Sequence, residues 1–317
     1  MFNQPINRNV FIISLIMLLL MIPTISDAAQ QRPPSSPMGP KPGWSFPLQG
    51  AFTHQFETDI DNNGGSFSVD RAFLQGGITY TTKKRQSFSL SLTYGFDGYD
   101  FEGNRGFAGL RPWKDINTYQ LSTPVLWGWD DKWTLFAMPS VRFSGESGVN
   151  LGDGTQGALF AGASYRFSDR LTIGPGIGIV TQIEDNATIF PVLIINWKIT
   201  DTLSLGTGSG AGATLGPGVF LNWKAARQWR FSVGGRFEKL RFRLNDNGIA
   251  PKGVGEDRSF PLLAGMTYYF TPLMHASLMV GVDLGGKLEL ADENGNQIVR
   301  EDYDTAGFAG IMLRFRF

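Results

Sequence analysis

The chain of 317 residues contains no cysteine and only two histidines. Without cysteine there can be no disulfide bond, no thiolate metal site and no lipid-modified N-terminal cysteine. Two histidines offer few ligands for a transition metal, so neither a cofactor nor a catalytic metal is expected. The 28 basic and 28 acidic residues balance, and a neutral chain lacks the positive surface with which proteins bind nucleic acid.

Long apolar runs are also missing after the N-terminal segment. Within that segment, one apolar run at residues 10–22 follows Arg8 and precedes the small residues Ser26 and Ala28. A membrane helix needs about 20 apolar residues. The run therefore predicts a secretory signal peptide, residues 1–28, that is cleaved after Ala28 or the next residue. A retained N-terminal anchor is the alternative.

Glycine and aromatic residues are abundant instead. The sequence holds 40 glycines, 25 phenylalanines and eight tryptophans, which suits an all-β chain with many turns. Residues 29–43 carry five prolines and no apolar periodicity, so we predict a flexible leader there. Residues 44–317 are predicted to form a single domain.

Strict alternation of apolar and small polar residues marks the segment 87–97. Side chains alternate faces along a strand, so the segment predicts a strand with one apolar and one polar face. The apolar face carries Phe88, Leu90, Leu92, Tyr94 and Phe96.

The same pattern recurs through the domain and predicts about fourteen antiparallel strands. Twelve is the alternative, because the pair of strands within residues 203–218 is short and rich in glycine. The predicted strands start near residues 46, 66, 87, 115, 133, 157, 171, 188, 203, 216, 229, 260, 276 and 305.

The connections favour a transmembrane barrel over a soluble β-sandwich, in which the polar face would meet water. Tight and long connections alternate, as in outer-membrane barrels with short periplasmic turns and longer external loops. The tight ones lie at 168–170, 200–202 and 226–228, and the long ones at 98–114, 144–156, 245–259 and 291–304.

The tryptophans favour the same fold. All but Trp113 fall at or beside the tight-turn end of a predicted strand. Aromatic girdles occupy membrane interfaces because the ring is apolar and its N–H needs a polar partner. A sandwich core would instead place its tryptophans in the middle of strands.

The last residues predict the strand that closes this barrel. Ile311, Leu313, Phe315 and Phe317 would face lipid, while Arg314 and Arg316 would face the interior. This ending resembles the C-terminal signal of outer-membrane proteins, in which a terminal aromatic residue ends an alternating strand. The resemblance implies the barrel assembly machinery as a partner and the bacterial outer membrane, with its lipid, as the location.

A wider resemblance covers the last 40 or so residues, which include GVDLGGKLELADENGNQIVREDYDTAGFAGIMLRFRF. This segment is similar to the ends of a family of uncharacterised proteobacterial outer-membrane β-barrel proteins. The resemblance implies the fold and the location, and it brings neither catalytic residues nor a substrate.

His275, Ser277 and Glu289 form the sharpest catalytic constellation. Their spacing resembles that of outer-membrane lipid A deacylases, in which histidine activates the serine. On one continuous strand, however, Ser277 and Glu289 would lie about 40 Å apart. A lipid-modifying hydrolase is therefore the second alternative function, and no catalytic residue is assigned. The other histidine, His54, is interpreted as an interfacial residue.

Asp59, Asp61, Asn63 and Asp70 match the spacing of a calcium-binding loop. The residues between them already alternate as a strand, and the helices that flank such loops are absent. A hairpin turn built from Asp, Asn and Gly explains the same residues. Calcium remains a weak candidate at these four residues.

The interior face carries the candidate functional residues. A polar interior with excess arginine predicts a porin-like channel for passive or weakly selective passage of small solutes, with a mild preference for anions. The alternative is a non-conducting barrel, closed by paired charges or by an inward-folded loop such as 98–114, that acts through its outer loops. The candidate lumen-lining residues are Arg71, Arg142, Arg236, Asp283, Arg314 and Arg316.

Overall fold

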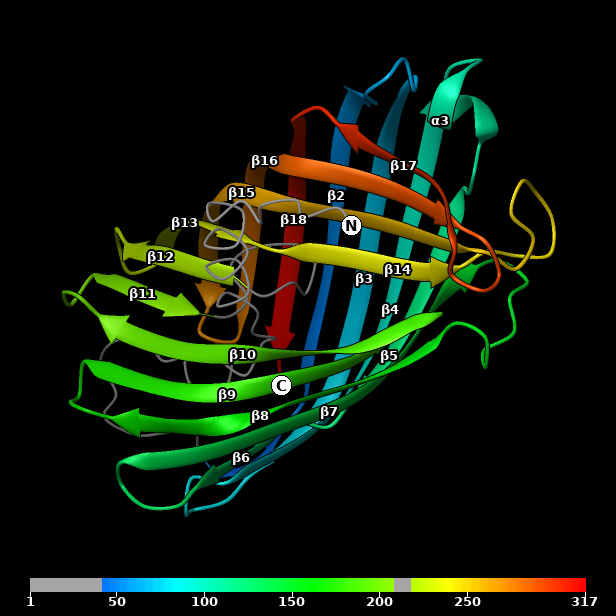
Figure 1. The fold of residues 1–317 in the computed structure, drawn as a ribbon. Helices are drawn as coiled ribbons and strands as arrows, with labels where there is room; N and C mark the ends of the chain where they lie inside the picture. Colours follow the sequence, from blue (N-terminus) through cyan, green and yellow to red (C-terminus); the bar gives the residue numbers. More distant parts are fainter. Residues whose placement is uncertain (1–41, 208–217) are drawn as a thin grey trace, which may run out of the picture.

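The computed structural model describes residues 42–207 and 218–317, which form one sheet that closes on itself (Figure 1). The predicted signal peptide, nearly all of the leader and the turn within 203–218 lie outside these residues. No helix in the described part of the chain is long and apolar enough to cross a bilayer. The elements are β1 Gly43–Ser45, β2 Pro47–Asp59, β3 Ser66–Thr81, β4 Ser87–Glu102, α3 Gly106–Leu110, β5 Asp115–Ser122, β6 Val125–Gly128, β7 Trp133–Glu146, β8 Thr155–Arg166, β9 Leu171–Gln182, β10 Asp185–Lys198, β11 Leu203–Thr207, β12 Gly218–Lys224, β13 Trp229–Arg236, β14 Glu238–Arg243, β15 Val254–Thr271, β16 Met274–Ala291, β17 Gln297–Tyr303 and β18 Ala306–Arg316.

The wall of the barrel has fourteen strands. Of the 18 strand segments in the sheet, four consecutive pairs share a neighbour and act as single interrupted strands. These pairs are β1 with β2, β5 with β6, β13 with β14, and β17 with β18. The predicted count of fourteen is confirmed, and twelve is excluded.

The C-terminal strand closes the barrel. β18 pairs antiparallel with β2, from Phe308 opposite Gln55 to Arg316 opposite Pro47. Its other edge pairs with β16, so neither edge of the last strand is free. This part of the sequence-based prediction is confirmed.

The two ends of the barrel differ, and we call them the tight-turn end and the long-loop end. The tight-turn end carries the short connections, such as those after β3, β8 and β15. At the long-loop end the chain holds the connection 103–114, with α3 inside it, and the connection 244–253.

All four predicted long connections are shorter than expected, and two of them are shortened most clearly. β15 begins at Val254, within the predicted loop 245–259, and β17 occupies much of the predicted loop 291–304. The turn between β16 and β17 is held by Asp292, which accepts hydrogen bonds from the side chain and backbone N–H of Asn296. These bonds lower the pKa of the Asp292 carboxyl. Where a strand extends beyond the apolar band, apolar and polar residues no longer alternate along it. The sequence alone therefore predicts a loop for these strand ends.

The outward face is apolar and ringed by tryptophans at the tight-turn end. Leu92, Val280 and Ile311 are typical of the exposed apolar residues of the band. Seven tryptophans with at least 36% of their surface exposed lie near the tight turns, and the eighth, Trp113, is buried. The exposed ones are Trp44, Trp127, Trp129, Trp133, Trp197, Trp223 and Trp229.

Glycine is required where β8 and β9 approach each other. A Cβ on Gly174 would lie 1.9 Å from the carbonyl oxygen of Ala163, which is backbone and cannot rotate away. Gly174→Ala should therefore destabilise the folded barrel by about 1–3 kcal/mol, as overpacking does, measured as a lower urea midpoint in lipid vesicles. Gly152→Ala is the matched control, because a Cβ there meets nothing within 4 Å. Equal midpoints for the two variants would contradict the steric argument.

Candidate functional site

The interior of the barrel is the candidate site. The structure places all six candidate lumen-lining residues on the inward side of their strands, but at different levels and with different partners. Three levels follow from the long-loop end to the tight-turn end: an aromatic cluster, a layer of charged residues and a small cavity.

The aromatic cluster fills the interior at the long-loop end. We call it the loop-end cluster, and it joins inward-facing wall residues to the connection 103–114. Trp113 lies at its centre, with ring centroids 5.1 Å from Phe242 and 5.5 Å from Phe107. Its buried members are Ile60, Phe67, Val69, Tyr99, Phe101, Phe107, Ala108, Trp113, Ile116, Phe242, Leu244, Ala250, Leu288, Leu290, Tyr303 and Ala306.

β14 crosses the mouth at this end. β13 pairs with both β12 and β15, whereas β14 pairs with β15 and, through Arg243 opposite Gly145, with β7 on a distant part of the wall. Figure 1 shows β14 running from β13 toward the ends of β5 and β7. The Gln156 amide of β8 donates to the carbonyl oxygen of Arg241 at 2.9 Å. β14 therefore narrows the opening that the loop-end cluster fills.

A layer of charged residues lies beneath this cluster, centred on Asp257. The Arg71 guanidinium donates to Asp257 Oδ2 at 2.8 Å and to Gln55 Oε1 at 2.9 Å. The hydroxyls of Tyr99 and Tyr303 donate to the same carboxylate at 2.8 and 3.2 Å. Asp257 is thus a fully bonded, buried anion.

The other charged side chains at this level also have polar partners. Arg71 Nε lies 3.4 Å from Asp97 Oδ1, and Arg236 Nε lies 2.5 Å from Glu238 Oε1. Three of the predicted lumen-lining residues therefore meet carboxylates, hydroxyls or amides and not open solvent. They are Arg236, with Glu238; Asp283, 3.5 Å from the Ser259 hydroxyl; and Arg142, which donates to Gln156 Oε1 at 3.1 Å.

Part of the interior is apolar, which the prediction of a polar lumen missed. The register aligns Phe136 of β7 with Gly162 and Gly176, so that its ring lies over both glycines. A separate apolar cluster on β8, β9 and β10 consists of Phe160, Val180, Phe190, Val192 and Ile194. We call this cluster, together with the buried residues Phe136 and Met138, the apolar wall.

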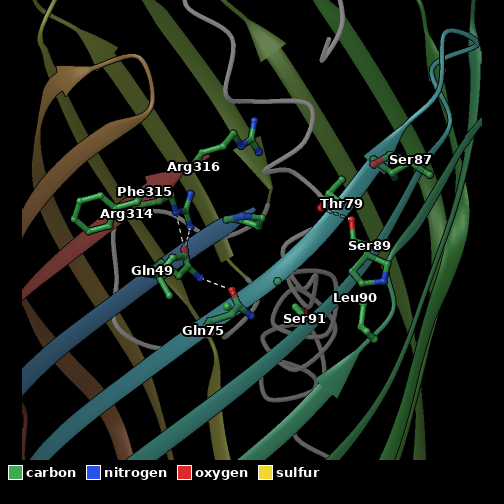
Figure 2. Close-up of a pocket in the computed structure, with 16 residues that line it drawn as sticks. Gln49, Gln75, Thr79, Ser87, Ser89, Leu90, Ser91, Arg314, Phe315 and Arg316 are labelled. Carbon is green, nitrogen blue, oxygen red and sulfur yellow. Dashed lines mark hydrogen bonds between the residues drawn. The ribbon is translucent and has the colours of Figure 1, made fainter. Parts of the chain in front are cut away.

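A cavity of about 130 Å³, lined by both polar and apolar residues, opens at the tight-turn end (Figure 2). Gln49 donates to Gln75 at 2.5 Å and accepts from Arg314 at 2.6 Å. Serine and threonine hydroxyls of β3 and β4 complete one side of it. We call this cavity the turn-end vestibule, and Arg314 and Arg316 are the charged side chains among its lining residues.

The hydrolase constellation is not assembled. His275, Ser277 and Glu289 all lie on the single strand β16, so Ser277 and Glu289 are about 40 Å apart. The Ser277 hydroxyl bonds to Thr267 at 2.8 Å, and Glu289 pairs with Arg300. The residues that resemble a deacylase site therefore have other partners.

The calcium candidates are also separated. Asn62 and Asn63 form a tight turn with positive φ, and the Asp70 carboxylate is bonded to His54 at 2.8 Å on the outward face. No group of three or more histidine, aspartate or glutamate side chains in residues 42–207 and 218–317 is arranged to hold a metal ion. A hairpin turn therefore explains these residues without a bound calcium ion.

The residues of the predicted assembly signal lie on the outward side of β18 or directly after it. Ile311, Leu313 and Phe317 are exposed, and Phe317 stacks on Phe315 with ring centroids 6.5 Å apart. Phe317 N–H also donates to the carbonyl oxygen of Phe46 at 3.2 Å, which ties the end of the chain to the first strand.

Comparison with known proteins supports the fold. No protein-family model matches the chain, and neither does a curated protein sequence. An outer membrane channel from Pseudomonas putida F1 matches with a TM-score of 0.51 at 10% identity, over 90% of this chain and 100% of that one. A FadL homologue from Pseudomonas aeruginosa gives 0.45 at 14% identity, over 94% and 98% of the chains. The toluene transporter TodX of Pseudomonas putida gives 0.44 at 9% identity, over 94% and 95%. The chain therefore has the fold of outer-membrane channels.

Proposed function

We propose that the chain is an outer-membrane channel for passive passage of small solutes, and that it rests in a closed state. The tight-turn end would face the periplasm and the long-loop end the exterior, as in bacterial outer-membrane barrels. Solute would move between the turn-end vestibule and the exterior when the loop-end cluster opens. The fold shared with an outer membrane channel supports this proposal.

The observation that carries the proposal is the composition of the closure. Phe107, Ala108 and Trp113 belong to the connection 103–114 and not to the wall, yet they lie in the buried centre of the loop-end cluster. A closure that depends on a connection can open without breaking the hydrogen bonds between wall strands. External loops of barrels are the segments that fold into or out of a lumen.

The alternative is a barrel that does not conduct and acts through its outer loops. The Asp257 layer favours it, because the charges that a permeating ion would meet are already paired. Current through the reconstituted protein distinguishes the two functions.

The test is single-channel recording of the refolded barrel in a planar bilayer at several salt gradients. We expect brief current steps with a reversal potential that favours anions, because the vestibule carries Arg314 and Arg316. The double variant Arg314→Gln, Arg316→Gln should move the reversal potential toward zero. Arg170→Gln, which removes an exposed positive charge at the same end, is the control for a loss of positive charge outside the vestibule. A folded barrel that never conducts would overturn the channel and leave the non-conducting function.

A further inference from the structure

Three basic residues stand in a row on the outward face of the sheet. Lys239 of β14 is directly opposite Arg258 of β15, and Arg258 is directly opposite Lys287 of β16. We call these residues the basic row. Like charges directly opposite each other on neighbouring strands are destabilising unless an anion lies between them.

The chain does not neutralise this row fully. Lys239 lies 3.1 Å from Glu256, and Lys287 pairs with Asp302, but both contacts are at the flanks. The side chain of Arg258, in the centre and only half-buried, makes no hydrogen bond or ion pair with any of the residues that the structure describes.

The neighbouring row of residues, closer to the long-loop end, differs from the basic row in its charge balance. There the order is Arg241, Glu256, Glu289 and Arg300, so each carboxylate has a basic residue opposite it on one side. The basic row, even with Asp302 opposite Lys287, keeps a surplus of positive charge that this neighbouring row lacks.

The height of the row in the wall points to lipid head groups. Tyr268, at the tight-turn end of β15, and Arg258 are ten residues apart. At about 3.4 Å per residue and a tilt of about 40°, this corresponds to roughly 26 Å of height, close to the apolar band of about 25 Å. The exposed residue Leu262 lies between them on the same face. The basic row therefore lies at the edge of the apolar band where outer-leaflet phosphates begin.

We propose that the basic row binds a phosphate group of the phosphorylated glycolipid of the outer leaflet. An arginine between two lysines can donate two parallel N–H bonds to one phosphate while the ammonium groups add charge. Basic clusters beside the bilayer bind anionic head groups in this way. The inference rests on the proposed outer-membrane location and orientation but not on conduction.

The test is a binding titration of the folded barrel in non-ionic detergent with bisphosphorylated lipid A, followed by native mass spectrometry. The double variant Arg258→Gln, Lys287→Gln should raise the Kd at least tenfold, because it removes the central contact and one flank. The same variant should record unchanged single-channel currents, which separates this site from the channel function. Folding of each variant is checked by its heat-modifiable gel mobility.

Two controls make the test specific. Arg170→Gln, which removes an exposed charge at the opposite end, should leave the Kd within twofold of that of the wild type. Lipid A stripped of its phosphates should bind the wild type as weakly as the double variant binds bisphosphorylated lipid A. An unchanged Kd in the double variant, an equal loss in Arg170→Gln, or displacement of lipid A by equimolar inorganic phosphate would each overturn the lipid site.

Discussion

Trp113→Ala should both destabilise the barrel and hold its long-loop end open. The side chain is only 3% exposed and lies in edge-to-face contact with Tyr99, Phe101, Phe107 and Phe242. Truncating a buried tryptophan costs about 3–5 kcal/mol. We expect a loss of this size in urea unfolding from lipid vesicles, together with longer and larger current steps in bilayers.

The conservative variant separates packing from polarity. Trp113 Nε1 has no hydrogen-bond partner within the described residues, so Trp113→Phe removes an unsatisfied donor and keeps an aromatic ring. That variant should lose less than about 1.5 kcal/mol and should conduct like the wild type. If Trp113→Ala is destabilised but its currents are unchanged, the loop-end cluster is structural and does not close the pore.

The barrel could be predicted from the sequence because its wall obeys one local rule. A strand that separates lipid from a polar interior must alternate apolar and polar residues. Segments such as 87–97 show this alternation in the sequence. The same parity placed Arg71 and Arg314 on the inward face, where the structure has them. Residues that share a face of one strand are fixed by their spacing, so no tertiary information is needed.

The contents of the lumen could not be predicted in the same way. Tyr99 and Asp257 are 158 positions apart in the sequence and meet only because the barrel closes. Nothing local marks Asp257 as the partner of Arg71, since β15 was expected to begin only at residue 260. The inward residue Phe136 of β7 also alternates correctly, but its partners are glycines on β8 and β9, and that match depends on register.

The structure changes the interpretation of the inward-facing arginines. From the sequence they favour a conducting pore with a mild preference for anions, because alternation shows their direction and not their partners. In the structure Arg71 and Arg236 meet carboxylates, whereas Arg314 bonds to the neutral Gln49. Arg314 and Arg316 are also the charged side chains that line the turn-end vestibule.

Asp257→Ala should cause the other large loss of stability. The substitution leaves the Arg71 guanidinium with Gln55 and a 3.4 Å contact to Asp97, and it removes the acceptor of two tyrosine hydroxyls. Removing one partner of a buried ion pair costs about 3–5 kcal/mol, because the remaining charge stays buried and loses its nearest compensating charge. We expect this decrease in the urea unfolding free energy at neutral pH, with the barrel still able to fold at low urea.

The double variant Asp257→Leu, Arg71→Met tests the cause. It removes both charges and keeps apolar volume next to the loop-end cluster, and replacing a buried ion pair by apolar residues is often neutral or stabilising. The double variant should therefore be more stable than Asp257→Ala alone by at least about 2 kcal/mol. If it is equally unstable, the loss comes from the tyrosine hydroxyls and not from the uncompensated guanidinium, and Tyr99→Phe in the double-variant background should then recover stability. If Asp257→Ala itself loses less than about 1 kcal/mol, water reaches Arg71 from the vestibule, and the charged layer lies in a wet path through the barrel.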